Sequence, residues 1–250
     1  MIKENILKIK SEIPENIKII AATKTRSIDE IKEALYSVIK IIGENYVQEA
    51  EAKFNFLKEL KKTADVRNVV QIASQEEIHF GASQKPNKPE GFSDFEIHLI
   101  GHLQRNKTKK AVEIFDLIQT VDSMEIAREI DKRCSEINKI MPVLIEINIA
   151  KEENKTGCMP ENVFKLAEEI SKLKNIKLRG IMAIGPNFDD KEKLRPYFNE
   201  AKEIFEELKK TNKEIEILSI GMSDSCKIAI ECGSNMVRIG TSIFGERIPK

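Results

Sequence analysis

The sequence predicts an α/β fold in which parallel strands close into a (β/α)8 TIM-type barrel. Short apolar runs alternate with longer amphipathic stretches along the 250 residues, and a strand-then-helix order of this kind places parallel strands side by side. Several runs, such as VLIEINIA, are apolar at nearly every position, as strands covered on both faces are. Eight such units match the usual length of a closed barrel, about 250 residues. Strand counting leaves an open doubly wound sheet as the alternative.

The predicted strands are the runs richest in aliphatic and β-branched residues. Small or polar residues that favour turns bound most of them. In chain order, the runs are Ile17–Lys24, Val38–Gly43, Glu96–Gly101, Phe115–Val121, Met141–Ile149, Ile176–Ile184, Ile215–Gly221 and Asn235–Gly240.

Amphipathic helices are expected between these strands, where apolar residues recur three and four positions apart. After the first strand, Ser27 is expected to cap a helix whose third residue is Glu30, the pattern of a capping box. A further helix, Glu4–Ile13, precedes the first strand and is expected to cap or flank the barrel. The clearest of the other helical stretches are Tyr46–Lys62, Ser123–Asn138, Pro160–Lys174 and Lys191–Lys210.

One segment interrupts the alternation. Residues 62–94 include the stretch ASQEEIHFGASQKPNKPEGFSD, whose later half is rich in Pro, Gly, Ser and Asn. This composition predicts an irregular insertion, in which Val66–Ser74 could form a short extra strand or helix. Apart from the insertion, residues 1–250 are expected to form a single domain, because their length lies near the upper limit for one core.

Composition and charge exclude several classes of partner. Lys and Arg number 41 and Asp and Glu number 41, so the chain has no overall basic surface of the kind that nucleic-acid binding requires. The N-terminus lacks the apolar core of a secretory signal, and no window is apolar enough to cross a membrane. The four cysteines are far apart and form no CxxC pair. We therefore expect a cytoplasmic protein with reduced thiols, no metal site, and neither nucleic acid nor membrane as partner.

Chemically capable side chains follow the ends of the predicted strands, where the active sites of such barrels lie. Lys24 ends the first apolar strand. Desolvation favours the neutral form of a lysine amine, and a neutral amine can form a Schiff base with an aldehyde. The alternative is a lysine whose charged end reaches solvent at the barrel rim.

The ends of the last two strands suggest an anion site. Ser223 is expected to be the N-cap of the helix DSCKIAIEC, which Gly233 terminates, and Gly240 and Thr241 follow the eighth strand. Phosphate sites recur after strands seven and eight of this barrel type. The alternative is that Ser223 only caps its helix and Gly240 only makes a turn. Arg238 lies within the eighth strand and faces either the barrel mouth or an outer ion-pair partner.

An ordered set of motifs resembles the pyridoxal phosphate homeostasis protein family, whose members bind pyridoxal 5′-phosphate (PLP) in a single barrel. The resemblance covers the chain from about Ile17 to Arg247, and the family's fold is similar to the N-terminal barrel of alanine racemase. The insertion at residues 62–94 is longer than this family usually has. The motifs are IAATKT, GENYVQEA, HLIGHLQRNK, VLIEINIAKEENKTG, LRGIMAIG and GMSDSCKIAIECGSNMVRIGTSIFGER.

The resemblance implies a PLP-binding role for each candidate residue. Lys24 matches the lysine that holds PLP as a covalent aldimine, and Arg238 matches the arginine that faces the pyridine nitrogen. The residues that match the phosphate cradle are Ser223, Gly240 and Thr241. Asn45 and Met182 match positions that line the ring pocket, with less direct correspondence.

The resemblance also implies a carrier that buffers or delivers PLP, with no robust catalytic activity, and PLP-dependent apo-enzymes as candidate partners. We separately expect a monomer. An arginine keeps its proton and so weakens PLP as an electron sink. The alternative is a slow PLP-dependent amino-acid racemase. Alanine racemase takes its second base from a further domain, which we do not expect in a chain ending at Lys250, so Tyr46 is the one internal candidate for that base. A third possibility is a barrel for another phosphate ligand, with Lys24 as a charge clamp.

Overall fold

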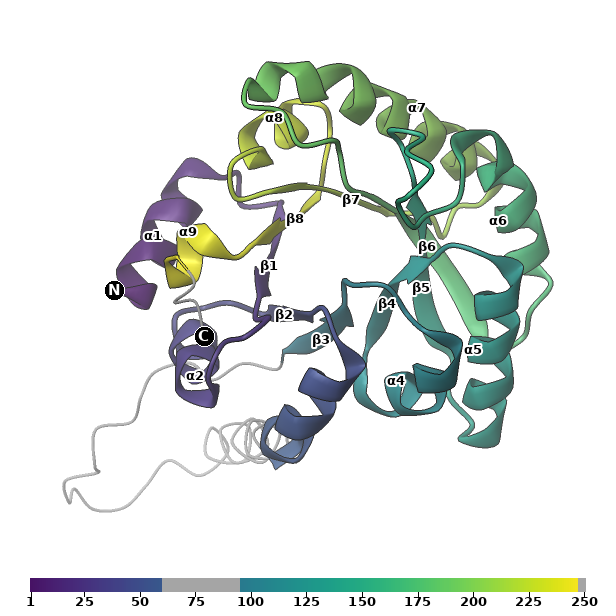
Figure 1. Ribbon diagram of the computed structural model, residues 1–250, viewed down its shortest axis with the longest axis horizontal. Coiled ribbons are helices and arrows are strands. Elements are labelled where there is room, and N and C mark those ends of the chain that lie inside the picture. Colours follow the sequence, from purple (N-terminus) through teal and green to yellow (C-terminus); the bar gives the residue numbers. More distant parts are fainter. Residues whose placement is uncertain (60–94, 247–250) are drawn as a thin grey trace, which may run out of the picture.

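The strands pair in chain order and close on themselves. In the computed structural model, described for residues 1–59 and 95–246, each strand is parallel to the next, and the last pairs with the first (Figure 1). The prediction of a closed barrel is therefore confirmed, and the alternative prediction of an open doubly wound sheet is wrong. The strands are β1 (Lys18–Ala22), β2 (Ile41–Glu44), β3 (Glu96–Leu99), β4 (Leu117–Val121), β5 (Met141–Ile147), β6 (Ile176–Ala183), β7 (Ile217–Met222) and β8 (Met236–Ile239).

Helices surround the barrel (Figure 1). Short 3-10 turns at Arg105–Lys107, Pro160–Asn162 and Lys191–Leu194 lead into three of them. The stretches predicted as helices are confirmed, within a turn at each end, wherever the structure describes them. The helices are α1 (Ile2–Glu12), α2 (Ile28–Tyr36), a helix at 47–59, α4 (Thr108–Ile114), α5 (Met124–Glu136), α6 (Val163–Ser171), α7 (Arg195–Thr211), α8 (Cys226–Glu231) and α9 (Thr241–Phe244).

Side-chain alternation along the strands divides the core into two parts. One residue points into the barrel and the next packs under the helices, as Ile20 and Ala21 of β1 do. The interior layer is small and apolar, as in other filled barrels. It consists of Ile20, Ile41, Ile100, Leu117, Leu144, Met182, Ile217 and Met236.

The first helix flanks the barrel, as predicted. α1 packs against α2 and α9, and Ile6 and Ile243 are both fully buried in their shared cluster. The side chain of Asn5 donates a hydrogen bond to the Ile243 carbonyl at 2.9 Å. The two ends of the described chain are therefore joined beside β1 and β8.

Some predicted boundaries differ from the observed ones. The second strand begins at Ile41, later than predicted, because Val38 has a left-handed backbone with φ of 72° and turns the chain. The insertion at 62–94, including Val66–Ser74, lies outside the described residues. None of the helices described is long and apolar enough to cross a membrane. Within residues 1–59 and 95–246, no group of three His, Cys, Asp or Glu side chains could hold a metal ion.

Candidate functional site

Lys24 lies at the carboxyl end of the barrel, in a loop between β1 and α2 that we call the lysine loop, residues 23–27. The side chain is half-buried, less enclosed than the sequence suggested. Its Nζ lies 4.8 Å from the centroid of the Tyr46 ring, a cation–π distance. Thr25 has a left-handed φ of 67°, which non-glycine residues adopt only when surrounding contacts hold them.

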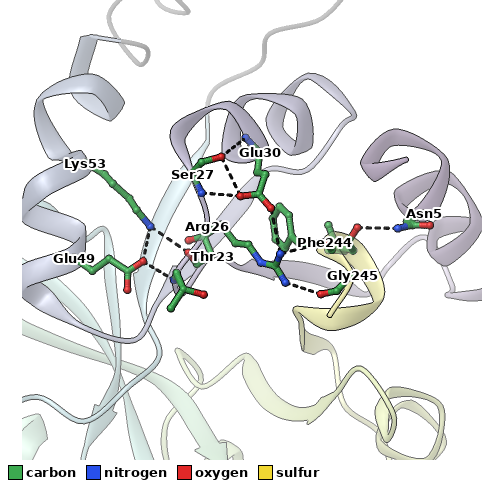
Figure 2. Close-up of polar contacts among 11 residues, drawn as sticks. Asn5, Thr23, Arg26, Ser27, Glu30, Glu49, Lys53, Phe244 and Gly245 are labelled. Carbon is green, nitrogen blue, oxygen red and sulfur yellow. Dashed lines mark hydrogen bonds and ion pairs between the residues drawn. The ribbon is translucent and has the colours of Figure 1, made fainter. Parts of the chain in front are cut away.

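A buried ion-pair cluster holds one side of the lysine loop (Figure 2). The Nζ of Lys53 donates to the Thr23 carbonyl at 3.1 Å, to Glu44 at 2.9 Å and to Glu49 at 2.8 Å. The Thr23 hydroxyl donates to Glu44 at 2.7 Å, and the Thr25 N–H donates to Glu49. Burial raises the pKa of Glu44, and Lys53 opposes that rise. The helix at 47–59 thereby fixes the backbone on both sides of Lys24.

Arg26 holds the other side of the loop against the C-terminal helix (Figure 2). Its guanidinium donates to the carbonyls of Phe244 at 3.3 Å and Gly245 at 2.5 Å, and lies 5.3 Å from the centroid of the Phe244 ring. Ser27 and Glu30 form the predicted capping box, in which the Glu30 carboxylate also contacts Arg26 at 3.2 Å. The backbone of the lysine loop is therefore fixed between two elements that are distant in sequence.

The loops after β7 and β8 meet at Ser223. The Ser223 Oγ accepts hydrogen bonds from the N–H of Gly240 at 3.2 Å and of Ser242 at 3.5 Å. Thr241, between them, is exposed. β8 also pairs with β1, and a Cβ built on Gly240 would lie 3.5 Å from the Cβ of Ala22. This hydroxyl and its backbone donors therefore lie next to the strand that leads to Lys24.

The prediction that Ser223 caps the following helix is wrong. α8 begins at Cys226, and its N-cap is Ser225, whose side chain makes no capping hydrogen bond. The left-handed Gly221, with φ of 93°, and a hydrogen bond from the Ser225 N–H to the Met222 carbonyl form a turn that delays the helix. Ser223 and Ser225 both lie near the start of this helix. The sequence alone did not show that Ser225 is the N-cap and that Ser223 lies in the preceding turn.

Arg238 points into the barrel and is almost entirely buried. One of its terminal nitrogens donates to both the carbonyl and the hydroxyl of Ser219 at 2.7 Å, and the other donates to the Ala183 carbonyl at 2.9 Å. Burial lowers the pKa of Arg238 to about 10, and the nearby Glu146 opposes that change. The predicted alternative of an outer ion pair is wrong, because the guanidinium lies inside the barrel.

A cavity of about 440 Å³ opens beside Arg238 at the ends of β6, β7 and β8. Ala183 and Ile184 line it, whereas Met182, predicted at the ring pocket, is fully buried in the layer below. Asn45 is half-buried at the end of β2, and its backbone packs so closely on Gly101 that a Cβ there would lie 2.2 Å from the Asn45 carbonyl oxygen.

Sequence reasoning missed Glu146, which lies inside the barrel mouth. It follows the interior residue Leu144 by two positions on β5 and is 5% exposed. One carboxylate oxygen accepts from the Thr156 hydroxyl at 3.1 Å, and the other has no hydrogen-bond partner among the described residues. Burial raises the pKa of Glu146, and Arg238 opposes the rise. Inward and outward positions alternate along the strand VLIEINIA, and this alternation could have identified Glu146 as an inward-facing residue.

Comparisons with known proteins agree with this architecture. Residues 1–248 match the family described as "Alanine racemase, N-terminal domain". The pyridoxal phosphate homeostasis protein of Pasteurella multocida is 35% identical over 258 residues, covering 98% of this chain and 97% of the relative. An alanine racemase of Clostridium difficile has a TM-score of 0.70 at 18% identity, covering all of this chain and 56% of that one, and so shares the fold.

Solved structures of PipY from Synechococcus elongatus are also similar. The form without PLP has a TM-score of 0.81 at 28% identity and covers 98% of this chain and 100% of that one. A second PipY structure, with PLP bound, has a TM-score of 0.78 at the same identity and coverage. Full-length similarity in both sequence and fold assigns the chain: it belongs to the pyridoxal phosphate homeostasis protein family, within the alanine racemase N-terminal-domain fold.

Proposed function

We propose that this protein binds PLP at the carboxyl end of its barrel and holds it as a reversible Schiff base on Lys24. The observation that carries the proposal is the placement of three groups on or directly after the neighbouring strands β1, β8 and β7. They are the lysine amine after β1, the arginine inside β8 and the Ser223 hydroxyl with its backbone N–H donors. An amine, a ring-nitrogen donor and a phosphate cradle are the contacts that a phosphorylated pyridine aldehyde needs.

The chain's residues fit that ligand. The hydrogen bonds described for Arg238 use three of its five N–H groups, which leaves two on a residue that lines the cavity. At Lys24, the neutral amine nitrogen attacks the aldehyde carbon, the C=N bond forms and one water leaves. Hydrolysis reverses the reaction, so a lysine fixed by its loop can both capture and release PLP.

A carrier fits these residues better than a racemase. Arg238 offers only donors and keeps the ring nitrogen an acceptor, which weakens the ligand as an electron sink; this argues against transamination and elimination, not against racemisation. A racemase also needs a base across the ligand from the lysine, whereas Tyr46 lies beside Lys24, with its ring 4.8 Å from the amine. The proposed role is therefore PLP buffering or delivery without robust catalysis, by a cytoplasmic monomer whose partners are PLP-dependent apo-enzymes.

Wild-type protein tests this function. Added PLP is expected to give the absorbance band of a Schiff base, and borohydride reduction followed by peptide mapping is expected to find the label on Lys24. A control with pyridoxal, which lacks the phosphate, should bind more weakly. Two results would favour a barrel for another phosphate ligand. One is reduction that labels no lysine, and the other is PLP that binds without forming the band and is fully displaced by other phosphate ligands. Clear solvent exchange at Cα of added amino acids, at a catalytic rate, would favour the racemase.

Ser223→Ala is expected to weaken PLP binding without preventing Schiff-base formation. Losing a hydrogen bond to a charged group typically costs about 1.5–3 kcal/mol, or roughly ten- to hundred-fold in affinity. Spectroscopic titration measures the change, with Ser223→Thr as the matched control because it keeps the hydroxyl. Equal affinity of Ser223→Ala and wild type would remove Ser223 from the phosphate cradle.

A further inference from the structure

A continuous series of hydrogen-bonded polar side chains crosses the interior of the barrel. Starting from Arg238, the Ser219 hydroxyl lies 2.7 Å away and Gln119 follows at 2.8 Å. Gln119 then contacts the His98 Nδ1 at 3.1 Å, and the His98 Nε2 lies 2.7 Å from the carboxylate of Glu96. Ser219, Gln119 and His98 are fully buried, whereas the Glu96 side chain is 56% exposed. The chain therefore joins the candidate PLP site to the opposite end of the barrel.

The donors in this chain all point one way. Arg238 can only donate, so the Ser219 oxygen accepts and its own proton is directed to the Gln119 carbonyl. The Gln119 amide nitrogen then donates to the His98 Nδ1, which requires His98 to carry its proton on Nε2. That proton is donated to Glu96. The Nε2–H tautomer of His98, together with this orientation of the Gln119 amide, satisfies every link.

We propose that Ser219, Gln119 and His98 are positioning residues that fix the guanidinium of Arg238 against the ligand ring. The proposal rests on the PLP-binding role argued above. Leaving a buried polar group without a hydrogen bond costs free energy, so most buried polar groups are satisfied, and a half-satisfied network is worse than an apolar interior. This series of hydrogen bonds meets the condition by ending on the carboxylate of Glu96, which is 56% exposed.

The four buried members come from four different strands, so the hydrogen bonds between them fix Arg238 relative to the barrel as a whole. His98 lies on β3, Gln119 on β4, Ser219 on β7 and Arg238 on β8. All occupy inward positions, two residues from members of the apolar interior layer. An arginine held only by neighbouring carbonyls could rotate, whereas a directed chain selects one orientation.

Gln119→Met tests this role, because methionine fills a similar volume and breaks the chain at its centre. We expect the absorbance maximum of bound PLP to shift and its affinity to fall by roughly five- to thirty-fold. The matched control is Leu117→Met, which lies two residues earlier on the same inward face and makes no hydrogen bond through its side chain. It should keep the wild-type spectrum and an affinity within about twofold. A folded Gln119→Met protein with the wild-type spectrum and affinity would overturn the proposal.

Nitrogen NMR provides a second test, in which the decisive spectra are those of the wild type. The sequence has three histidines, and His98→Gln identifies the signal of His98. We expect the Nε2–H tautomer in the ligand-free protein and a change in its shifts on adding PLP. Ser219→Ala should abolish that response while retaining the tautomer signal. A Nδ1–H tautomer, or a His98 signal that is unaffected by PLP, would refute the chain.

The failure of this inference differs from the failure of PLP binding. Wild-type protein that forms no Schiff base would remove the proposed function itself. If the wild type binds PLP and the variants of Gln119 and Ser219 bind it identically, the proposed function stands. The hydrogen bonds from Arg238 to Glu96 would then have a structural role only.

Discussion

Lys24→Ala is expected to abolish covalent capture of PLP. Without the amine no C=N bond can form at this position, so borohydride should fix no label on the protein and the Schiff-base band should be absent. The remaining groups at Ser223 and Arg238 would still bind PLP, but only non-covalently. Equilibrium dialysis with radiolabelled PLP, run beside the reduction experiment, separates the two kinds of binding.

Lys155→Ala is the matched control for Lys24→Ala. Lys155 lines the cavity that also includes Arg238, so its amine is an alternative nucleophile at the same end of the barrel. This variant should keep both the absorbance band and the label. Labelling that survives in Lys24→Ala and disappears in Lys155→Ala would move the covalent site from β1 to the loop after β5.

Lys53→Met is expected to destabilise the fold by about 3–5 kcal/mol, the usual effect of removing one partner of a buried ion pair. Lys53 is 8% exposed and Glu44 is fully buried, and the second oxygen of Glu44 already has no partner among the described residues. Methionine would leave that carboxylate without its cation and would release the Thr23 carbonyl. Urea denaturation measures the loss.

The pH dependence of Lys53→Met follows from the raised pKa of Glu44. A carboxyl whose pKa is higher in the folded than in the unfolded state binds protons more tightly when folded. The free energy of unfolding therefore falls as pH rises from the ordinary value of 4.5 through the folded pKa. Removing Lys53 raises that pKa further, so the deficit should grow with pH and shrink in acid.

The double variant Lys53→Met/Glu44→Gln separates the charge from the packing. Glutamine keeps the shape of Glu44 and needs no buried cation, so most of the lost stability should return and the added pH dependence should disappear. A double variant as unstable as Lys53→Met would assign the effect to packing of the lysine stem instead of the ion pair.

The barrel was predictable because its determinants are local. Apolar runs at regular spacing specify buried parallel strands, and Ser27 with Glu30 specifies a helix start within four residues. Lys24 was identified for the same reason, since the end of an apolar strand marks the mouth of a barrel. The motif resemblance then indicated PLP as the ligand, which the periodicity of apolar residues alone does not predict.

The supports of the site were not predictable from local pattern. Gln119 and Ser219 lie within predominantly apolar runs, and their hydrogen bond joins positions 100 residues apart. Which strands face one another across the interior depends on closure and stagger of the barrel. Lys53 has the spacing of a helix residue that could equally face solvent, and only the tertiary structure directs it to Glu44.

The contacts of Arg26 impose an order of events on biosynthesis. The hydrogen bond from Arg26 to the Gly245 carbonyl joins residues 219 positions apart, so it forms only after almost the whole chain has left the ribosome. Until then, the strained turn at Thr25 lacks half of its support, and β1 lacks its partner β8. A nascent chain therefore carries Lys24 as an ordinary flexible lysine. Under the proposed function, the capacity to capture a reactive aldehyde would arise with barrel closure, and PLP retention would then be a direct readout of completed folding.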